Sequence, residues 1–369
     1  MKKFFLFSFF CALFLTANAQ LVSLKASELA KLKTLIAKEA DVKNHWEKLL
    51  KTADEALSAT PNPADTILSE GILQGDPRKI KTWKSLDDMQ KIYALGLAYK
   101  VGGLQKYLDK ASEFLLAWAK RNQPQGNPIN DTTLDRIIFT YDLLKTDLKP
   151  EVIVTFKAWL NELAKQEIKT LAEAKANKGS TKSYNNWNSH RIKVLTQIGV
   201  VLNDKKLTDT AIHAYFTQIS QNLNSDGSSF DFRERDALHY HIYDIDPLLV
   251  AATILSRHRK IDLDYYTTSL MKDVSLKKSV EWLLPYYTGE KIHAEWVNTK
   301  SAFDKKRAEN GEKGYTVGTL FKPIEARTSI ALAGYFDPRM IGFYQNEAKM
   351  NTKYPTWQFV LNELKNINR

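Results

Sequence analysis

Apolar residues recur at steps of three and four along most of this chain. The segments 104–118, 134–144 and 152–163 each place an apolar stripe on one face, which is the period of an amphipathic α-helix. Other stretches have the same helical character: 26–57, 85–101, 187–203, 207–223, 236–257, 266–285, 324–335 and 354–367. Alternating runs are too short for a sizeable sheet, so the sequence predicts an all-α protein.

Pro, Gly, Asn and Asp cluster between these helical stretches and mark the connections. The connection 58–84 is long for a compact helical domain, and loops of that size are commonly lids or binding loops. A second irregular stretch, rich in Gly, Lys and aromatic residues, covers 289–321. Helix pairs joined by short loops are consistent with an α/α barrel or incomplete toroid. Periodicity alone does not separate that fold from an irregular bundle.

The first nineteen residues have the three parts of a cleavable export signal. Lys2 and Lys3 precede an apolar run over 4–16, and small residues follow up to Ala19. We expect cleavage after Ala19, a periplasmic or secreted protein, and one catalytic domain over 20–369. Cys11 lies inside the apolar run rather than at a lipobox, so no lipid anchor is predicted. No later apolar stretch reaches the roughly 18 residues of a membrane-spanning helix.

Cysteine content and charge narrow the function further. Cys11 is the only cysteine, so cleavage would remove it and exclude thiol nucleophiles, Fe–S clusters and cysteine-based zinc sites. The formal net charge is +11. An exported basic protein meets no genomic DNA, so its polyanionic partner would be an acidic polysaccharide or a surface, not nucleic acid. Lysines that only maintain solubility are an equal alternative. No obligate protein partner is evident.

A first polar cluster covers 183–191 at a loop-to-helix entry. It contains Asn185, Asn186, Trp187, His190 and Arg191. Near a helix N-terminus, these donors would suit an anionic ligand. The alternative is that Asn caps the helix and the His is structural. Capping needs a single Asn, so we favour the functional interpretation.

A second cluster covers 233–244. If the segment is one helix, Arg235, His239 and Tyr243 share one side at i, i+4 and i+8. His239 and His241 are two residues apart and face different sides, which argues against a shared metal. Tyr240 is expected in the core. For Arg235 and Tyr243 taken alone, functional and structural interpretations both remain open.

Two weaker candidates come from the irregular stretches. Aromatic residues over 282–296 accompany Lys291 and His293 and could stack on sugar acids or form a packed loop. The connection 58–84 carries Lys81 in a basic segment with a Trp. It is expected to be a lid over a groove or an exposed basic loop.

In their order along the chain, these segments resemble the alginate lyase family of polysaccharide lyases. The pair Asn185-Asn186 resembles the Asn-Asn of its Asn-Asn-His motif, and 237–243 resembles its Ala-Leu-x-Tyr-His-x-Tyr segment. Upstream segments at 118–120, 126–130 and 141–142 also match, as do 285–286 with 289–291. The resemblance covers roughly residues 70–295.

Two departures from the family pattern concern the site itself. Trp187 stands where the family has His, and His190 follows three positions later. Asp236 stands at the family's Arg position, with Arg235 one residue away. These departures indicate a divergent branch and leave the roles of His190 and Arg235 open.

The resemblance implies β-elimination at a uronic acid residue within an α/α barrel, without metal or cofactor. Asn186 and Arg235 would neutralise the substrate carboxylate, since such donors offset charge that grows in the transition state. His190 would be the base or a neutraliser, and Tyr243 the acid and, for some linkages, the base as well. Expected substrate-binding residues are Asn185, Trp187, His239, His241, Lys81, Lys291 and His293. Poly-mannuronate is the favoured polymer, with glucuronan as the alternative.

Two other functions compete with a lyase. A glycoside hydrolase on an α/α toroid would need two carboxylates flanking the scissile bond. The candidates are Asp231, Glu234, Asp236 and Asp244, but the sequence does not indicate the separation of any pair. A non-catalytic glycan-binding protein would explain export, aromatic residues and charge, but not the polar clusters.

Overall fold

The computed structural model describes residues 22–258, 263–268, 270–271, 273–343, 360–362 and 364. The predicted signal at 1–19 and most of the predicted helix 354–367 lie outside these residues. Over the described ranges there is no strand, only two isolated bridges, Leu223 with Ser229 and Ala294 with Leu320. None of the helices described there is long and apolar enough to cross a membrane. The all-α prediction is confirmed.

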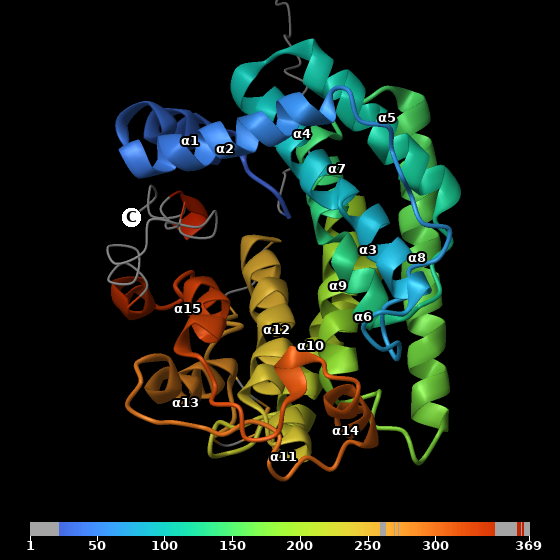
Figure 1. The fold of residues 1–369 in the computed structure, drawn as a ribbon. Helices are drawn as coiled ribbons and strands as arrows, with labels where there is room; N and C mark the ends of the chain where they lie inside the picture. The colour runs from blue at the N-terminus through green and yellow to red at the C-terminus, as the bar shows by residue number, and fades with distance from the viewer. Residues whose placement is uncertain are drawn as a thin grey trace, which may run out of the picture.

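The N-terminal half packs its helices around one hydrophobic core (Figure 1). Within it, α4 contacts α2, α5 and α7, and α5 contacts α8. The largest side chains of this core include Trp118, Tyr141 and Phe156. The helices are α1 (Ala26–Lys38), α2 (Ala40–Ala56), α3 (Pro77–Leu86), α4 (Asp88–Gly102), α5 (Gln105–Arg121), α6 (Pro128–Asp131), α7 (Asp135–Leu144) and α8 (Pro150–Ala176).

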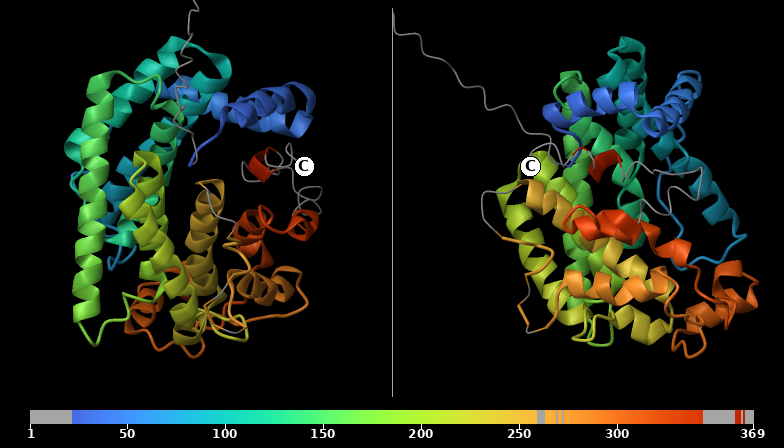
Figure 2. Two further views of the ribbon diagram at one scale, coloured as in Figure 1. Left: turned by 180° about the vertical axis from the view of Figure 1, so that it is seen from behind. Right: turned by 90° about the vertical axis from the view of Figure 1, so that its left-hand side faces the viewer.

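The C-terminal half forms a second core, and one buried helix lies between the two. That helix, α9 (Asn186–Leu202), packs against α8, α10 and α12 and is buried along most of its length. The long helix α8 forms one edge of the molecule in the left view of Figure 2. The helices of this half are α10 (Lys205–Asn222), α11 (Phe230–Arg235), α12 (Leu238–His258), α13 (Leu276–Tyr287), α14 (Ala302–Glu309) and α15 (Arg327–Ala333). Short 3₁₀ turns are η1 (Thr132–Leu134), η2 (Lys313–Tyr315) and η3 (Pro323–Ala326).

The chain breaks inside two stretches that the sequence predicted as continuous helix, and inside the segment 233–244, whose alignment was given for the case that it is one helix. Glu39 separates α1 from α2, and α13 begins only at Leu276, after Ser275 accepts a cap bond from the Lys278 amide. The third break, at Asp236, matters for function. Its φ of 50° is left-handed, a conformation that Asp tolerates better than most residues.

The break at Asp236 corrects the predicted alignment of the second cluster. Arg235 ends α11, whereas His239 and Tyr243 belong to α12, so the three do not share one helix face. The Asp236 carboxylate accepts bonds from the Asn298 amide and side chain at 2.7 and 3.0 Å. Glu295 caps the new helix by accepting the Leu238 amide at 2.7 Å. Both partners come from the stretch 289–321, which sequence periodicity left undefined.

The two long irregular stretches contact each other across the molecule. The Gln74 amide donates to Glu312 Oε1 at 2.7 Å, and Asn310 Nδ2 donates to the Gln74 carbonyl at 3.1 Å. Residues 58–84 are therefore connected by hydrogen bonds to the segment that follows α14.

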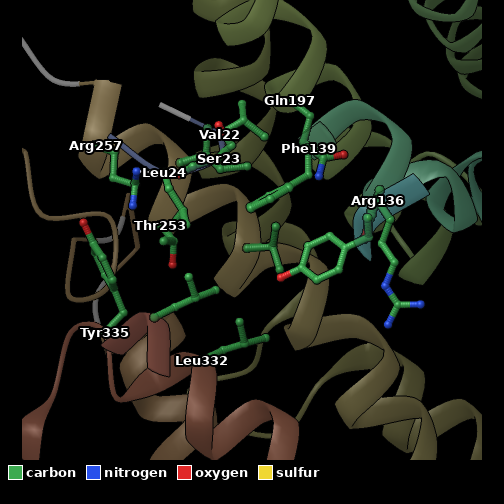
Figure 3. Close-up of a pocket in the computed structure, with 15 residues that line it drawn as sticks. Val22, Ser23, Leu24, Arg136, Phe139, Gln197, Thr253, Arg257, Leu332 and Tyr335 are labelled. Carbon is green, nitrogen blue, oxygen red and sulfur yellow. Dashed lines mark hydrogen bonds between the residues drawn. The ribbon is translucent and has the colours of Figure 1, made fainter. Parts of the chain in front are cut away.

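A cavity of about 210 Å³ lies beside the C-terminal half of α12 (Figure 3). Phe139, Leu332 and Tyr335 give it a largely apolar wall. Arg257 reaches its rim, but the guanidinium is held by Glu28 at 2.7 and 2.9 Å. The cavity is separate from the cleft at the other end of α12, where the predicted site residues gather.

Candidate active site

A cleft of about 460 Å³ lies beside the N-terminal half of α12. Steps of four and three along α12 put His239, Tyr243 and Asp246 on this wall, because such steps share one helix face. The opposite wall comes from η3 and α15. The full lining is His239, Ile242, Tyr243, Asp246, Ile324, Glu325, Arg327 and Thr328. Two residues predicted from sequence, Tyr243 and His239, thus share one cleft.

Tyr243 contacts His190 across the α9–α12 interface. Their ring centroids are 4.3 Å apart and their planes are tilted by 49°. His190 Nδ1 lies 2.9 Å from Thr132 Oγ1, which fixes the ring. Burial lowers the pKa of His190 well below its ordinary value, and the charge of Lys193 adds to this. The imidazole is therefore neutral at neutral pH and cannot offset a carboxylate with a full charge.

The Tyr243 phenol is protonated at neutral pH. Burial raises its pKa most, Tyr240 adds to the rise, and the positive charge of Arg307 acts against it. A protonated phenol at the cleft wall can donate to a leaving oxygen. It can accept a proton only in its phenolate form, which a nearby cation would stabilise.

The start of α9 is fixed by protein groups. Asn185 is the N-cap, with its side-chain oxygen accepting the Trp187 amide at 3.0 Å. Asn186 donates its backbone and side-chain N–H groups to Asp231 at 2.8 and 2.5 Å. Asp231 therefore occupies the anion position that the sequence analysis gave to a ligand. Trp187 is half-buried, with Lys182 Nζ 3.7 Å from its ring centroid.

Burial raises the pKa of Asp231 to about 6, while the bonds from Asn222 and Asn186 hold it down. The Asn222 side chain donates to Asp231 at 2.9 Å, so both carboxylate oxygens are engaged. The side-chain nitrogen of Asn186 has two N–H groups. Only one of them donates to Asp231.

Arg191, the neighbour of His190, belongs to a buried ion pair. Its Nε donates to Glu167 at 2.9 Å, and the two side chains are 1% and 0% exposed. Asp131 lies beside them, and burial, followed by the charge of Glu167, raises its pKa well above the ordinary value. This group anchors α9 to α8 and is structural.

Arg235 does not present a free guanidinium. Its Nη1 lies 2.7 Å from both carboxylate oxygens of Asp304, and the guanidinium stacks 4.1 Å from the Tyr240 ring centroid. The predicted carboxylate donor is thus engaged with a carboxylate of the protein itself.

Arg307 on α14 is a further residue near the cleft that was not predicted from the sequence. Its Nη1 donates to the hydroxyls of Tyr240 and Tyr315 at 3.0 and 2.8 Å. A signal for this short helix exists: Ser301 and Asp304 have the spacing of a capping box, and Ser301 does accept the Asp304 amide at 3.2 Å. The helix is too short for apolar periodicity to reveal it.

Four other predicted binding residues are not brought to the cleft wall. His241 is in the core, 3.1 Å from the Ser279 carbonyl, where burial lowers its pKa to about 4. His293 Nε2 lies 3.1 Å from the Asp236 carbonyl at the α11–α12 junction. Lys291 and Lys81 are exposed. Their assignment to substrate binding stays a prediction.

Metal-ligating side chains do not cluster in the described part of the chain, where no group of three His, Cys, Asp or Glu is arranged to hold an ion. The polar side chains that line the cleft are a phenol, an imidazole, a guanidinium, a hydroxyl and two carboxylic acids.

The comparisons with known proteins agree on one family. The family model described as "Alginate lyase" matches residues 36–293. None of the curated protein sequences compared matches the chain. An alginate lyase structure from Bacteroides ovatus is similar with a TM-score of 0.66 and 20% identity, covering 93% of this chain and 98% of that one.

Two structures of an alginate lyase from Sphingomonas species A1 are similar to a smaller share of this chain. Alginate lyase A1-III has a TM-score of 0.57 and 20% identity, covering 74% of this chain and 80% of that one. A variant of A1-III complexed with a tetrasaccharide has a TM-score of 0.55 and 19% identity, with coverage of 74% and 79%. At these identities the likeness shows a shared fold, the α/α toroid that the sequence predicted.

Proposed function

The chain belongs to the alginate lyase family of polysaccharide lyases, and we propose that it cleaves a uronic acid polymer by β-elimination at the cleft that Tyr243 lines. The observation that carries this proposal is the contact of Tyr243, which lines the cleft, with the buried ring of His190, 4.3 Å between ring centroids. Poly-mannuronate is the first candidate substrate and glucuronan the second.

In the proposed reaction, Tyr243 transfers the proton. Its phenolate oxygen takes the proton from C5, the C–H electrons form the C4=C5 double bond, and the C4–O4 bond breaks. The same phenol then returns the proton to O4 of the leaving sugar. General acid–base steps of this kind contribute about 10²–10⁴ each in rate. His190 is only 4% exposed, so it supports the Tyr243 ring from beneath more readily than it reaches C5.

The proton at C5 becomes acidic only if the adjacent carboxylate is neutralised. The second N–H of Asn186 is not bonded to Asp231, but the residue is 2% exposed and is absent from the cleft lining, so its role as a donor stays a prediction. Arg235 was expected to share this task, but its contact with Asp304 limits it to acting through its charge. His239, exposed on the cleft wall, is placed to contact a sugar ring.

A hydrolase remains the second candidate, because two carboxylic acids, Asp246 and Glu325, line the same cleft. Burial raises the pKa of Asp246 to about 7, and Ser329 donates to it at 2.5 Å. The acids proposed from sequence are less suitable: Asp231 and Asp244 are 2% and 0% exposed and bonded to Asn186 and Ser189.

Product chemistry separates the two functions. The protein should be incubated with poly-mannuronate, poly-guluronate, glucuronan and glycosaminoglycans, and followed by ultraviolet absorbance and product mass. A lyase gives absorbing products whose new end is 18 Da lighter than a hydrolysis product, since no water is added. Cleavage without absorbance would instead support the hydrolase. The N-terminal residue of the exported protein tests the signal predicted at 1–19.

A further inference from the structure

The cleft needs a cation near the substrate carboxylate, and the motif position does not supply it. Asp236 stands at that position and bonds Asn298. The adjacent Arg235 is held by both oxygens of Asp304. A guanidinium that already satisfies a carboxylate in a two-oxygen contact has little left to offer a second one.

Arg307 is held in a different way. Its Nη1 donates to two neutral phenols, Tyr240 and Tyr315, which orient the group without cancelling its charge. The nearest carboxylates are farther away, Asp304 at 3.6 Å and Glu312 at 3.9 Å. The Arg307 side chain is 13% exposed, and in such surroundings a charge acts more strongly than in water.

The carboxylates nearest to Arg307 are shared with other cations. Asp304 interacts with both Arg235 and Arg307, and Glu312 interacts with both Arg307 and Lys79. Asp231 also attracts Arg235. Because Asp304 and Glu312 are divided in this way and lie beyond hydrogen-bond distance of Arg307, they offset its charge only in part.

The phenols that hold Arg307 also contact the cleft residues. The Tyr240 and Tyr243 rings are 6.2 Å apart, and the Tyr315 and His239 rings are 6.2 Å apart. Burial raises the pKa of Tyr243 most, and Arg307 is the cation that acts against this rise. Arg307 therefore lies directly behind the wall at which the proton would be transferred.

We infer that Arg307, rather than Arg235, supplies the positive charge that offsets the substrate carboxylate and the phenolate of Tyr243 when the C5 proton is removed. This inference rests on the proposed β-elimination. It assigns to α14, a helix outside the sequence motifs, the task that the resemblance gave to Arg235. A preorganised charge of this kind is worth about 10²–10³ in rate.

The test compares Arg307→Gln and Arg235→Gln on poly-mannuronate and on its methyl ester, which has no carboxylate to neutralise. We expect Arg307→Gln to lower kcat by about 10²–10³ on the free acid and clearly less on the ester. The fold-loss of kcat on the free acid should be less than a tenth as large for Arg235→Gln as for Arg307→Gln. Arg233→Gln, on the same short helix as Arg235 but in a half-exposed pair with Asp226, is the matched control and should leave kcat unchanged.

Equal losses on acid and ester would overturn the inference, because a purely structural role does not depend on substrate charge. A larger loss for Arg235→Gln than for Arg307→Gln would overturn it as well. If wild type does not cleave the ester, the inference is tested by the kcat losses of Arg307→Gln and Arg235→Gln on the free acid alone, and the loss must be larger for Arg307→Gln. If Arg307→Gln loses its helical circular dichroism, Arg307→Met, which removes the charge and keeps a long side chain, is measured by the same criteria. Inactivity of wild type on every uronate polymer would instead overturn the proposed function itself.

Discussion

His190 and Tyr243 lie ring against ring, 4.3 Å between centroids, although they come from different helices. Pro247 in α12 has no N–H, so the carbonyl of Tyr243, four residues earlier, has no helical donor. The Tyr243 backbone raises the pKa of His190 against the larger effect of burial, while Nε2 of the ring has no hydrogen-bond partner. The Tyr243 carbonyl thus keeps its polarity toward α9 instead of toward its own helix.

Replacing Pro247 with Ala should weaken this contact. The new amide would donate to the Tyr243 carbonyl and reduce the effect of that carbonyl on the His190 ring. We expect kcat to fall several-fold while the melting temperature stays the same or rises, since Pro is unfavourable inside a helix. Steady-state kinetics and thermal unfolding measure both. An unchanged kcat would show that the carbonyl plays no part in the active geometry.

The pH dependence should come from Tyr243 and not from His190. Burial keeps His190 neutral and raises the pKa of Tyr243. Because the phenolate fraction then grows about tenfold for each pH unit below that pKa, kcat/KM should rise with a slope near one between about pH 7 and 9. A limb centred near pH 6.5 would contradict this prediction, because it would indicate that a group other than Tyr243 controls the rate.

Asp231→Asn tests how Asn186 is held. Burial raises the pKa of Asp231 to about 6 from its ordinary value near 3.8. Between these two values the folded state keeps a proton that the unfolded state has released, so wild type loses stability as pH rises. The variant cannot titrate there, and its stability relative to wild type should increase over the same window. Urea unfolding at pH 4, 5 and 6.5 measures this.

The same variant should lower activity, because Asn cannot accept both donors of Asn186 equally well. Asp226→Asn, at a half-exposed carboxylate, is the control and should leave kcat unchanged. A constant stability difference from pH 4 to 6.5 would indicate that Asp231 stays ionised throughout.

Arg191→Met should destabilise the protein strongly. It leaves Glu167 buried without its partner, and breaking a buried pair typically costs about 3–5 kcal/mol. Adding Glu167→Gln should recover part of that free energy, because the unpaired charge disappears. Urea denaturation of the single and double variants decides, and a double variant that is less stable than the single one would count against this explanation.

Helices with a sustained apolar period were predictable from the sequence. Trp118 and Leu160 repeat with their neighbours at helical spacing, and both are buried in the core as expected. The predicted loop-to-helix entry at Asn185 also coincides with the observed cap. In these segments local preference and tertiary packing agree, which is why pattern alone suffices.

The features that the sequence did not predict depend on contacts between residues that are distant along the chain. The break at Asp236 is stabilised by Asn298 and Glu295, which lie far along the chain. The sequence around Asp236 does not predict these two contacts. Arg307 is held near the site by hydrogen bonds to the hydroxyls of Tyr240 and Tyr315, and its helix, α14, is distant from α12 along the chain. His241 lies between site residues in the sequence, and its helix phase turns it toward Ser279 and the core, so its assignment to substrate binding stays a prediction.

The most direct test of the account is removal of the single phenol oxygen in Tyr243→Phe. The ring and its packing on His190 are kept, so helical circular dichroism and thermal unfolding should match wild type. The rate of appearance of unsaturated uronate, followed by ultraviolet absorbance on poly-mannuronate, should fall by at least about 10³, because one group supplies both proton transfers. A folded variant with near-normal turnover would contradict the central claim.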